Sequence, residues 1–181
     1  MSTKINLKSK LEFGNAQIEL EDTTIKIKGA KGEIKRNFKI PGINVKKENN
    51  SLLFTSKFCS RREKRAINTC KAHIKNMIKG VSEGFVYKLK ICSGHFPITT
   101  EIKGKELIIK NFLGESIPRK AKILENVNVK INGTEIIVDG VDKESVGQTA
   151  VNIEKATQIK NRDRRVFMDG IWLIEKAGKP I

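Results

Sequence analysis

The sequence predicts an α+β protein of two similar tandem domains, each a small, mainly antiparallel sheet covered on one face by one main helix. Two observations carry this prediction: the chain repeats part of itself, and each copy has the same order of strand and helix patterns. A third observation is the glycine-bounded stretch GVSEG (80–84), which lies between the copies. We therefore expect an N-terminal α+β domain at residues 1–83 and a C-terminal α+β domain at residues 84–181.

The repeat is seen when the sequence is shifted by 84 positions. INVKKENNSLLF (43–54) then falls on VNVKINGTEIIV (127–138), and AINTCKA (66–72) falls on AVNIEKA (150–156) without a gap. IKIKGAKGE (25–33) resembles LIIKNFLGE (107–115) at a shift of 82. One constant shift across two unlike segments indicates duplication rather than chance similarity of basic, isoleucine-rich sequence.

Each copy is expected to begin with strands. In the first, residues 23–29 and 32–38 alternate apolar and polar residues around a turn, and 43–48 with 51–56 predict a hairpin across Asn49-Asn50. In the second, residues 105–112, 127–131 and 135–140 repeat the pattern, with the favoured hairpin turn Asn132-Gly133.

A helix is expected after each hairpin. Ser60 would cap the first, with Glu63 completing a capping box, and Gly80 would end it. Asp142 would cap the second. The stripes that would cover the sheets are Ile67, Cys70, Ile74, Met77 and Ile78 in the first helix, and Val146, Ala150, Ile153 and Ala156/Thr157 in the second.

The charge balance predicts a polyanionic partner. The chain has 36 Lys and Arg against 20 Asp and Glu, a net charge of +16, and self-repulsion of this size opposes compactness. Nucleic acid is the first candidate partner. An anionic membrane surface is the second candidate. No apolar run approaches the roughly 20 residues of a membrane span, and the expected helices carry core stripes rather than a basic face opposite Trp and Phe, so no membrane partner is expected. Three cysteines without a signal-peptide pattern favour reduced thiols and a cytoplasmic protein.

Two motifs suggest a metal site, but the first has a simpler interpretation. Cys70-x-x-His73 and Cys92-x-x-His95 have the spacing of zinc half-sites, although Cys70 also lies on an apolar helix stripe, where a buried thiol is ordinary. No bound metal or cofactor is therefore expected.

Catalytic motifs are scarce. The chain contains no phosphate-binding Gly-Lys-Ser/Thr loop, no nucleophile elbow and no His-Glu-x-x-His. Asp163, Asp169 and Glu175 could form the carboxylate site of a magnesium-dependent nuclease. However, Asp169-Gly170 is also a plain turn dipeptide, and Asp163 lies among arginines with which it can pair. An enzyme is not expected.

Basic residues gather at three places. They are Arg61, Arg62 and Arg65 at the start of the first helix, Lys110, Arg119, Lys120 and Lys122 around NFLGESIP (111–118), and Lys160, Arg162, Arg164 and Arg165 after the second helix. Arginines in a short irregular segment can fork onto phosphates and stack on bases. The last group continues into Val166, Phe167, Ile171 and Trp172, which we expect to fix the segment to the domain core; stacking of Phe167 and Trp172 on bases is the alternative.

Four long motifs resemble one family. They are HIKNMIKGVSEGFVYKLK (73–90), HFPIT (95–99), NFLGESIPRKAKIL (111–124) and KNRDRRVFMDGIWLIEK (160–176). The sequence is similar to the large-ribosomal-subunit protein six family in the universal naming, of archaeal and eukaryotic type, called number nine in eukaryotes. The resemblance covers nearly the whole chain, including its two-copy layout, although residues 1–58 match mainly in pattern.

The resemblance implies two α+β domains in the large ribosomal subunit, in the cytoplasm. The implied partners are large-subunit rRNA and neighbouring ribosomal proteins, near the stalk base and the sarcin–ricin loop where translational GTPases dock; no small-molecule substrate is implied. The C-terminal domain would make the principal RNA contacts, through Lys160, Asn161, Arg162, Arg164 and Arg165 and through Arg119, Lys120 and Lys122. Family members commonly have Tyr where Trp172 stands, and usually lack a cysteine at Cys92.

Three functions are therefore compared. The favoured one is a non-catalytic rRNA-binding constituent of the large subunit. The alternative is a metal-dependent nucleic-acid-processing enzyme, and a zinc-binding regulatory module ranks third. If the first is right, replacing Arg162, Arg164 and Arg165 by alanine should weaken rRNA binding and flatten its salt dependence without unfolding the protein.

Overall fold

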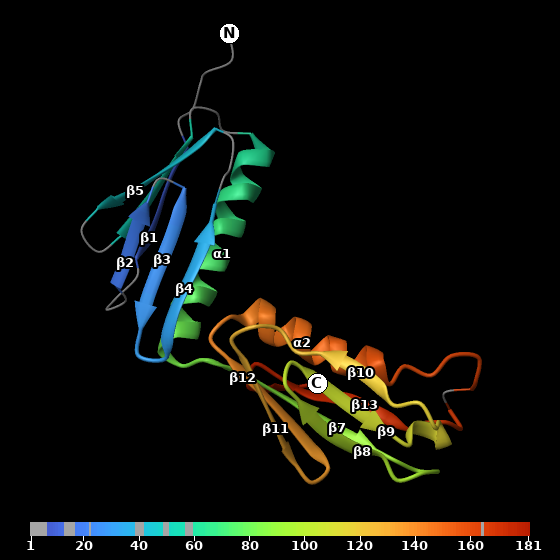
Figure 1. Ribbon diagram of the computed structural model, residues 1–181. Coiled ribbons are helices and arrows are strands. Elements are labelled where there is room, and N and C mark those ends of the chain that lie inside the picture. The colour runs from blue at the N-terminus through green and yellow to red at the C-terminus, as the bar shows by residue number, and fades with distance from the viewer. Residues whose placement is uncertain are drawn as a thin grey trace. The chain divides into compact units, whose positions relative to one another are not determined.

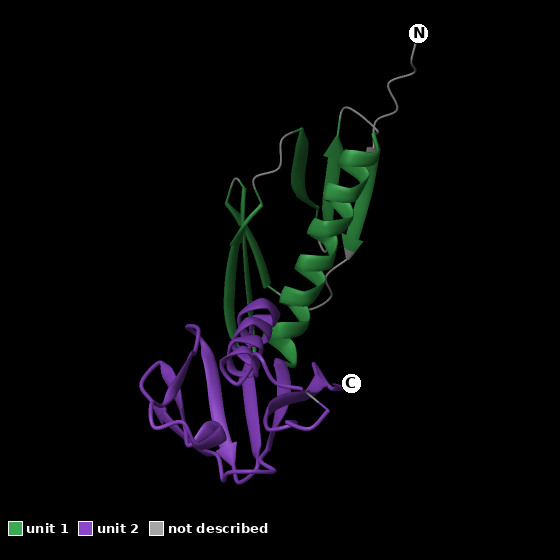
Figure 2. Ribbon diagram, turned by 90° about the vertical axis from the view of Figure 1, so that its right-hand side faces the viewer, with its two compact units in different colours: residues 1–83 green, residues 84–181 purple. Residues whose placement is uncertain are grey.

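A computed structural model describes residues 7–12, 17–21, 23–38, 42–48, 51–56, 60–163 and 165–181. The chain divides into two compact units, residues 1–83 and 84–181, whose elements are labelled in Figure 1 and coloured by unit in Figure 2. Within the described residues neither helix is both long and apolar enough to cross a membrane.

The described residues of the first unit form two three-stranded antiparallel sheets and one long helix. The sheets have the orders β1-β6-β5 and β2-β3-β4. Ile25 and Ile27 of β3 are fully buried, as are Ile67 and Ile74 of α1, which packs on β3 and β4 (Figure 1). The elements are β1 (Leu7–Glu12), β2 (Gln17–Glu21), β3 (Thr24–Gly29), β4 (Gly32–Asn37), β5 (Ile43–Glu48), β6 (Ser51–Ser56) and α1 (Arg61–Ser82).

Helix α1 begins as its sequence predicts and ends later. Ser60 is the N-cap and forms the full capping box with Glu63. The prediction that Gly80 ends the helix is wrong, because the helix continues to Ser82 and Gly80 is buried inside its last turn. Val81 is held by tertiary contacts: its carbonyl accepts a 2.9 Å hydrogen bond from the N–H of Lys31, and its side chain fills the space beside Gly29.

The second unit has the same plan with additions. Its sheets have the orders β10-β9-β8 and β11-β12-β7-β13-β14, all antiparallel, and α2 packs on β7, β10, β12 and β13. Asp142 caps α2 as predicted, and the hairpin from Asn132 turns through Gly133 and Thr134. The elements are β7 (Phe85–Cys92), β8 (Thr99–Lys103), β9 (Glu106–Lys110), the short 3-10 turn η1 (Phe112–Gly114), β10 (Arg119–Lys122), β11 (Val127–Asn132), β12 (Glu135–Gly140), α2 (Lys143–Ala156), β13 (Gly170–Lys176) and β14 (Lys179–Pro180).

The two units share one strand order, which confirms the predicted α+β class with two similar halves. The order β1-β6-β5 corresponds to β7-β12-β11, and β2-β3-β4 corresponds to β8-β9-β10. The structure differs in one respect, since each half divides its strands between two sheets where one was expected. The predicted Asn49-Asn50 turn lies outside the described residues.

The second copy departs from the first in three places. Residues 111–118 join β9 to β10, where residues 30–31 alone join β3 to β4. Helix α2 has 14 residues and α1 has 22, so the chain leaves the helix earlier and runs through 157–169. Strands β13 and β14 then extend the sheet beyond β7. These additions shape the candidate site.

Candidate RNA-binding site

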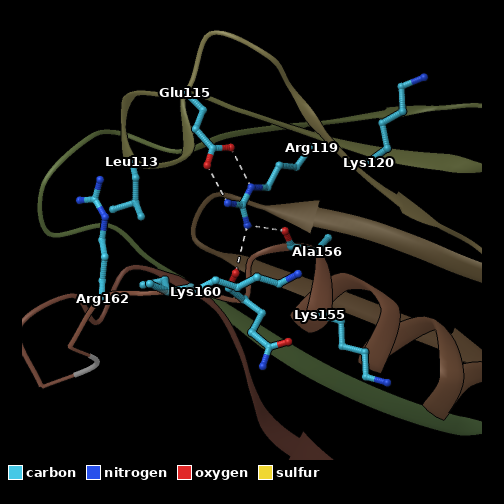
Figure 3. Close-up of a pocket in the computed structure, with 10 residues that line it drawn as sticks. Leu113, Glu115, Arg119, Lys120, Lys155, Ala156, Lys160 and Arg162 are labelled. Carbon is cyan, nitrogen blue, oxygen red and sulfur yellow. Dashed lines mark hydrogen bonds and ion pairs between the residues drawn. The ribbon is translucent and has the colours of Figure 1, made fainter.

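A cavity of about 480 Å³ lies in the second unit between the 111–118 loop, β10, the end of α2 and the segment that follows it (Figure 3). Most of its wall comes from the two segments that have no counterpart in the first copy. The lining residues are Leu113, Glu115, Arg119, Lys120, Lys155, Ala156, Gln158, Ile159, Lys160 and Arg162.

Arg119 holds the walls of this cavity together. Its guanidinium donates to both carboxylate oxygens of Glu115, with Nε–Oε2 at 2.8 Å and Nη2–Oε1 at 2.6 Å. Nη1 donates to the carbonyls of Ala156 at 3.0 Å and Gln158 at 3.2 Å, at the end of α2, where carbonyls lack helical partners. The guanidinium also lies 4.3 Å from the ring centre of Phe112. Arg119 is thus engaged within the protein, although its sequence position groups it with RNA-binding residues.

The contact with Arg119 also changes the pKa of the Glu115 carboxyl. The hydrogen bond from Arg119 is the main cause that lowers the pKa of Glu115, and the nearby charge of Arg162 adds to it. Glu115 therefore stays ionised at neutral pH and neutralises Arg119. The cavity's attraction for an anion must come from its other cations.

Those cations are Lys155, Lys160 and Arg162. Lys155 and Lys160 are exposed and have no ion pair or side-chain hydrogen bond among the described residues. The Arg162 guanidinium lies 4.8 Å from the ring centre of Phe167, which orients it without using its N–H donors. All three can bind an anion from the cavity side. Lys155 was not singled out from the sequence, where it is one more lysine of a helix.

Two of the three lysines around the 111–118 loop form ion pairs with glutamates of neighbouring strands. Lys110 bridges both oxygens of Glu101 at 2.9 Å, and Lys120 pairs with Glu106 at 3.3 Å. Lys122 is exposed and forms no ion pair within the described residues. Of this predicted group only Arg119 and Lys120 reach the cavity wall.

The segment after α2 folds into a compact turn. The Asp163 carboxylate accepts hydrogen bonds from the Arg165 backbone N–H at 2.9 Å and from its Nη2 at 2.8 Å, while the Asp163 carbonyl accepts from Val166 and Phe167. The Arg165 side chain remains 90% exposed. Asn161 is exposed, and Arg164 lies outside the described residues.

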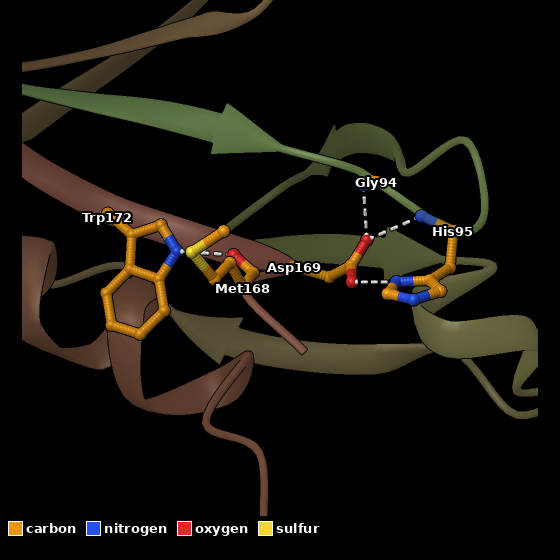
Figure 4. A network of polar contacts seen from close by, with 5 residues as sticks. All are labelled: Gly94, His95, Met168, Asp169 and Trp172. Atoms are coloured by element: carbon orange, nitrogen blue, oxygen red, sulfur yellow. Dashed lines mark hydrogen bonds and ion pairs between the residues drawn. The ribbon is translucent and has the colours of Figure 1, made fainter. Parts of the chain in front are cut away.

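Asp169 fixes this segment to the sheet (Figure 4). The carboxylate is 2% exposed; Oδ1 accepts from the backbone N–H of Gly94 and His95, and Oδ2 lies 2.5 Å from His95 Nδ1. The His95 ring stacks on Phe167 with ring centres 4.9 Å apart. One chain of contacts therefore runs from Asp169 through His95 and Phe167 to the Arg162 guanidinium.

The expected apolar anchors are only partly correct. Ile171 is fully buried and its N–H donates to the buried Thr157 hydroxyl at 2.9 Å, and Phe167 is half-buried. The expectation for Val166 is wrong, because the turn at Asp163 directs its side chain outward, where it is 61% exposed. Trp172 is 38% exposed and lines a groove.

Hydrogen bonding decides the ionisation of Asp169. Burial alone raises the pKa of this carboxyl, but the donors from His95 and Gly94 outweigh burial and hold the pKa below its ordinary value. Asp169 is therefore a structural carboxylate that is ionised at neutral pH.

The carboxylates proposed for a magnesium site are each engaged elsewhere. Asp163 pairs with Arg165, Asp169 binds the loop at His95, and Glu175 pairs with Lys88 at 2.7 Å. In the part of the chain that the structure describes, no group of three or more His, Cys, Asp or Glu side chains is placed to hold a metal.

The two zinc half-sites belong to different units. Cys70 is buried on α1 of the first unit, and this burial raises the pKa of its thiol, while Cys92 is half-buried on β7 of the second unit. One ring nitrogen of His95, Nδ1, is already hydrogen-bonded to Asp169 Oδ2.

The predicted cations of the first unit lie on the opening turns of α1. Arg61, Arg62 and Arg65 are exposed, and Arg65 Nε donates to the Arg61 carbonyl at 3.3 Å. They belong to a different unit from the cavity and do not line it.

Comparison with known proteins assigns the chain to a family. The ribosomal protein L6 family profile matches residues 14–84 and 96–170, one segment in each copy. The chain is 49% identical over 166 residues to large ribosomal subunit protein uL6 of Methanococcus vannielii, covering 92% of this chain and 91% of the relative. It is 48% identical over 165 residues to the protein of the same name from Staphylothermus marinus, covering 89% of each. The chain therefore belongs to the ribosomal protein L6 family.

Proposed function

We propose that the protein is a structural constituent of the large ribosomal subunit in the cytoplasm, and that its second unit binds large-subunit rRNA through the cationic cavity. The protein is not an enzyme. Its family is that of a ribosomal protein, and the relatives named above are by name large-subunit proteins.

One observation carries the assignment of the site. The additions that distinguish the second copy from the first converge on a cavity with three cations, Lys155, Lys160 and Arg162, that form no ion pair among the described residues. In the described residues of the first copy the shared strands and helix pack without these additions. A cluster of cations without ion pairs in a concave wall is the expected complement of a folded polyphosphate.

The supporting contacts make the cavity suitable for tight binding. Arg119 ties the loop to the end of α2, and Asp169 ties the 94–95 loop to the segment that carries Arg162. Because protein contacts already order the cavity walls, RNA binding would require less further ordering. Phosphate contacts of this kind position the protein without reading sequence.

The place of the protein in the subunit is the finer part of the proposal. From the four motifs that resemble the family, we propose that the protein lies near the stalk base and the sarcin–ricin loop. Neighbouring ribosomal proteins are then partners, and translational GTPases dock close by.

The test is the salt dependence of binding to large-subunit rRNA transcribed in vitro. The double variant Lys160→Ala/Arg162→Ala should bind more weakly and reduce the slope of log affinity against log salt by about 1 to 2. The matched control is Lys130→Ala/Lys179→Ala, which removes the same charge from exposed strand positions outside the cavity. Equal effects of the two pairs on affinity and slope would reject the cavity as the RNA site.

A further inference from the structure

We infer that the second unit captures one unstacked nucleotide of the RNA, with its phosphates in the cationic cavity and its base against Trp172 in an adjoining groove. This inference rests on the proposed function and specifies the form of RNA recognised. It follows from the groove, from the fixed position of the indole and from the wall that the groove shares with the cavity.

The groove has a volume of about 240 Å³ and lies between the last turns of α2 and the start of β13. Four of its seven lining residues are aromatic or aliphatic, Val151, Ile159, Phe167 and Trp172, and the other three are Glu154, Lys155 and Gln158. The volume is below the roughly 300 Å³ at which pockets for drug-sized ligands begin. A single planar base suits this groove better than a helix or a strand.

The indole of Trp172 is held in place before any ligand binds. Its Nε1 donates to the Met168 carbonyl at 3.1 Å (Figure 4). The ring also lies over Gly170, where an added Cβ would be 3.3 Å from Cε2 and from Nε1. The ring nevertheless remains 38% exposed. A fixed and partly exposed indole is a stacking surface with little ordering cost.

The groove and the cationic cavity are adjacent, because Lys155, Gln158 and Ile159 line both. A ligand that spans both must carry an anionic group on one side and a flat apolar ring on the other. A nucleotide has this combination. The side-chain amide of Gln158 has no hydrogen bond within the described residues, so it can meet the polar edge of a base.

Charge favours RNA over a protein side chain as the occupant. An apolar side chain would fill the groove but would leave Lys155 and Lys160 without a counter-charge. Single-stranded loops and bulges offer the complete ligand, since their unstacked bases can stack on aromatic side chains while their phosphates face cations. The inferred target is an extruded base rather than a continuous duplex.

Trp172 is the only tryptophan of the chain, so its fluorescence reports on the groove alone. The wild-type protein is titrated with in-vitro-transcribed large-subunit rRNA and, separately, with a fully paired RNA duplex without loops. We expect the rRNA to quench the Trp172 emission. The duplex, which supplies phosphates but no free base, should leave the emission unchanged.

Affinity gives an independent readout. Trp172→Leu should weaken rRNA binding about tenfold or more without changing the salt slope, since no charge is removed, whereas Trp172→Tyr should retain most of the affinity. Phe96→Leu, an exposed aromatic that does not line the groove, is the matched control and should bind as wild type. Thermal melts establish that each variant is folded.

The inference is overturned if bound rRNA leaves the emission unchanged, or if folded Trp172→Leu binds as tightly as wild type. Both results would be seen if the groove instead took an apolar side chain of a neighbouring protein. If the proposed function itself were wrong, the wild-type protein would show no salt-dependent affinity for rRNA. That result would reject both the proposed function and this inference.

Discussion

Arg119 and Arg162 illustrate at the residue scale how two similar side chains acquire different tasks. Both line the same cavity. Arg119 uses its donors on Glu115 and on two carbonyls at the end of α2, while Arg162 is oriented by the face of Phe167 and keeps its donors available. The first arginine builds the site, and the second is positioned to meet the ligand.

Arg119→Ala should therefore destabilise the fold more than it weakens electrostatic attraction. Its loss leaves Glu115 unpaired and removes the donors to Ala156 and Gln158, which we expect to lower the free energy of unfolding by about 2 kcal/mol. Lys120→Ala, which breaks only an exposed ion pair with Glu106, should cost less than about 1 kcal/mol. Urea unfolding of the two variants checks this order, and equal losses would contradict it.

Asp169→Asn should remove a stabilisation that depends on pH. Because the folded pKa of Asp169 lies below its ordinary value, its contribution is complete above about pH 4 and is lost as the pH falls through the folded pKa. Near neutral pH we expect the variant to be less stable by about 1 to 2 kcal/mol. The gap between wild type and variant should narrow as the pH falls through the folded pKa of Asp169. A gap that stays constant on acidification would contradict this role.

Residues whose partners are near in sequence were predictable. The capping box of Ser60 with Glu63 and the Asp142 cap join residues a few positions apart, so their geometry follows from local sequence. The partners of Asp169 lie more than seventy positions away, at Gly94 and His95. No local pattern distinguishes this buried aspartate from one in a plain turn.

At the scale of elements, the hairpins and helices of the repeat were predictable, because their apolar spacing is regular. Strand β7, the centre of the five-stranded sheet, was missed although Phe85, Tyr87, Leu89 and Ile91 alternate and are buried. The internal repeat could not predict β7, because β7 and its counterpart β1 share little sequence.

The predicted end of α1 at Gly80 was wrong, because tertiary contacts at Val81 outweigh the tendency of Gly80 to stop a helix.

Gly140 at the end of β12 and Gly147 inside α2 should respond in opposite directions to alanine. A Cβ at Gly140 would lie 2.7 Å from Val146 Cγ2 and 3.0 Å from the Asn126 carbonyl, so Gly140→Ala should lower the free energy of unfolding by about 1 to 3 kcal/mol. A Cβ at Gly147, inside α2, would meet the Tyr87 hydroxyl at an ordinary 3.5 Å. Gly147→Ala should therefore add up to about 1 kcal/mol of stability. Thermal melts compare the pair, and a shift of the same sign in both would refute this packing.

At the scale of the whole molecule, duplication supplies a scaffold and later additions supply the site. In the first unit the shared strands and helix pack together although the β3–β4 turn is short and the helix is long. The longer loop and strands β13 and β14 belong to the second unit. The second unit uses these additions to expose Lys155, Lys160 and Arg162 around one cavity. The net charge of +16 provides general attraction to RNA, and the cavity provides a defined contact.

The most direct test of this account is a high-resolution map of the native large ribosomal subunit that contains this protein. The account predicts rRNA phosphate oxygens within hydrogen-bonding distance of Lys160 and Arg162, inside the cavity of the second unit. A map in which these two side chains face solvent, with the rRNA contacts made elsewhere on the protein, would contradict it.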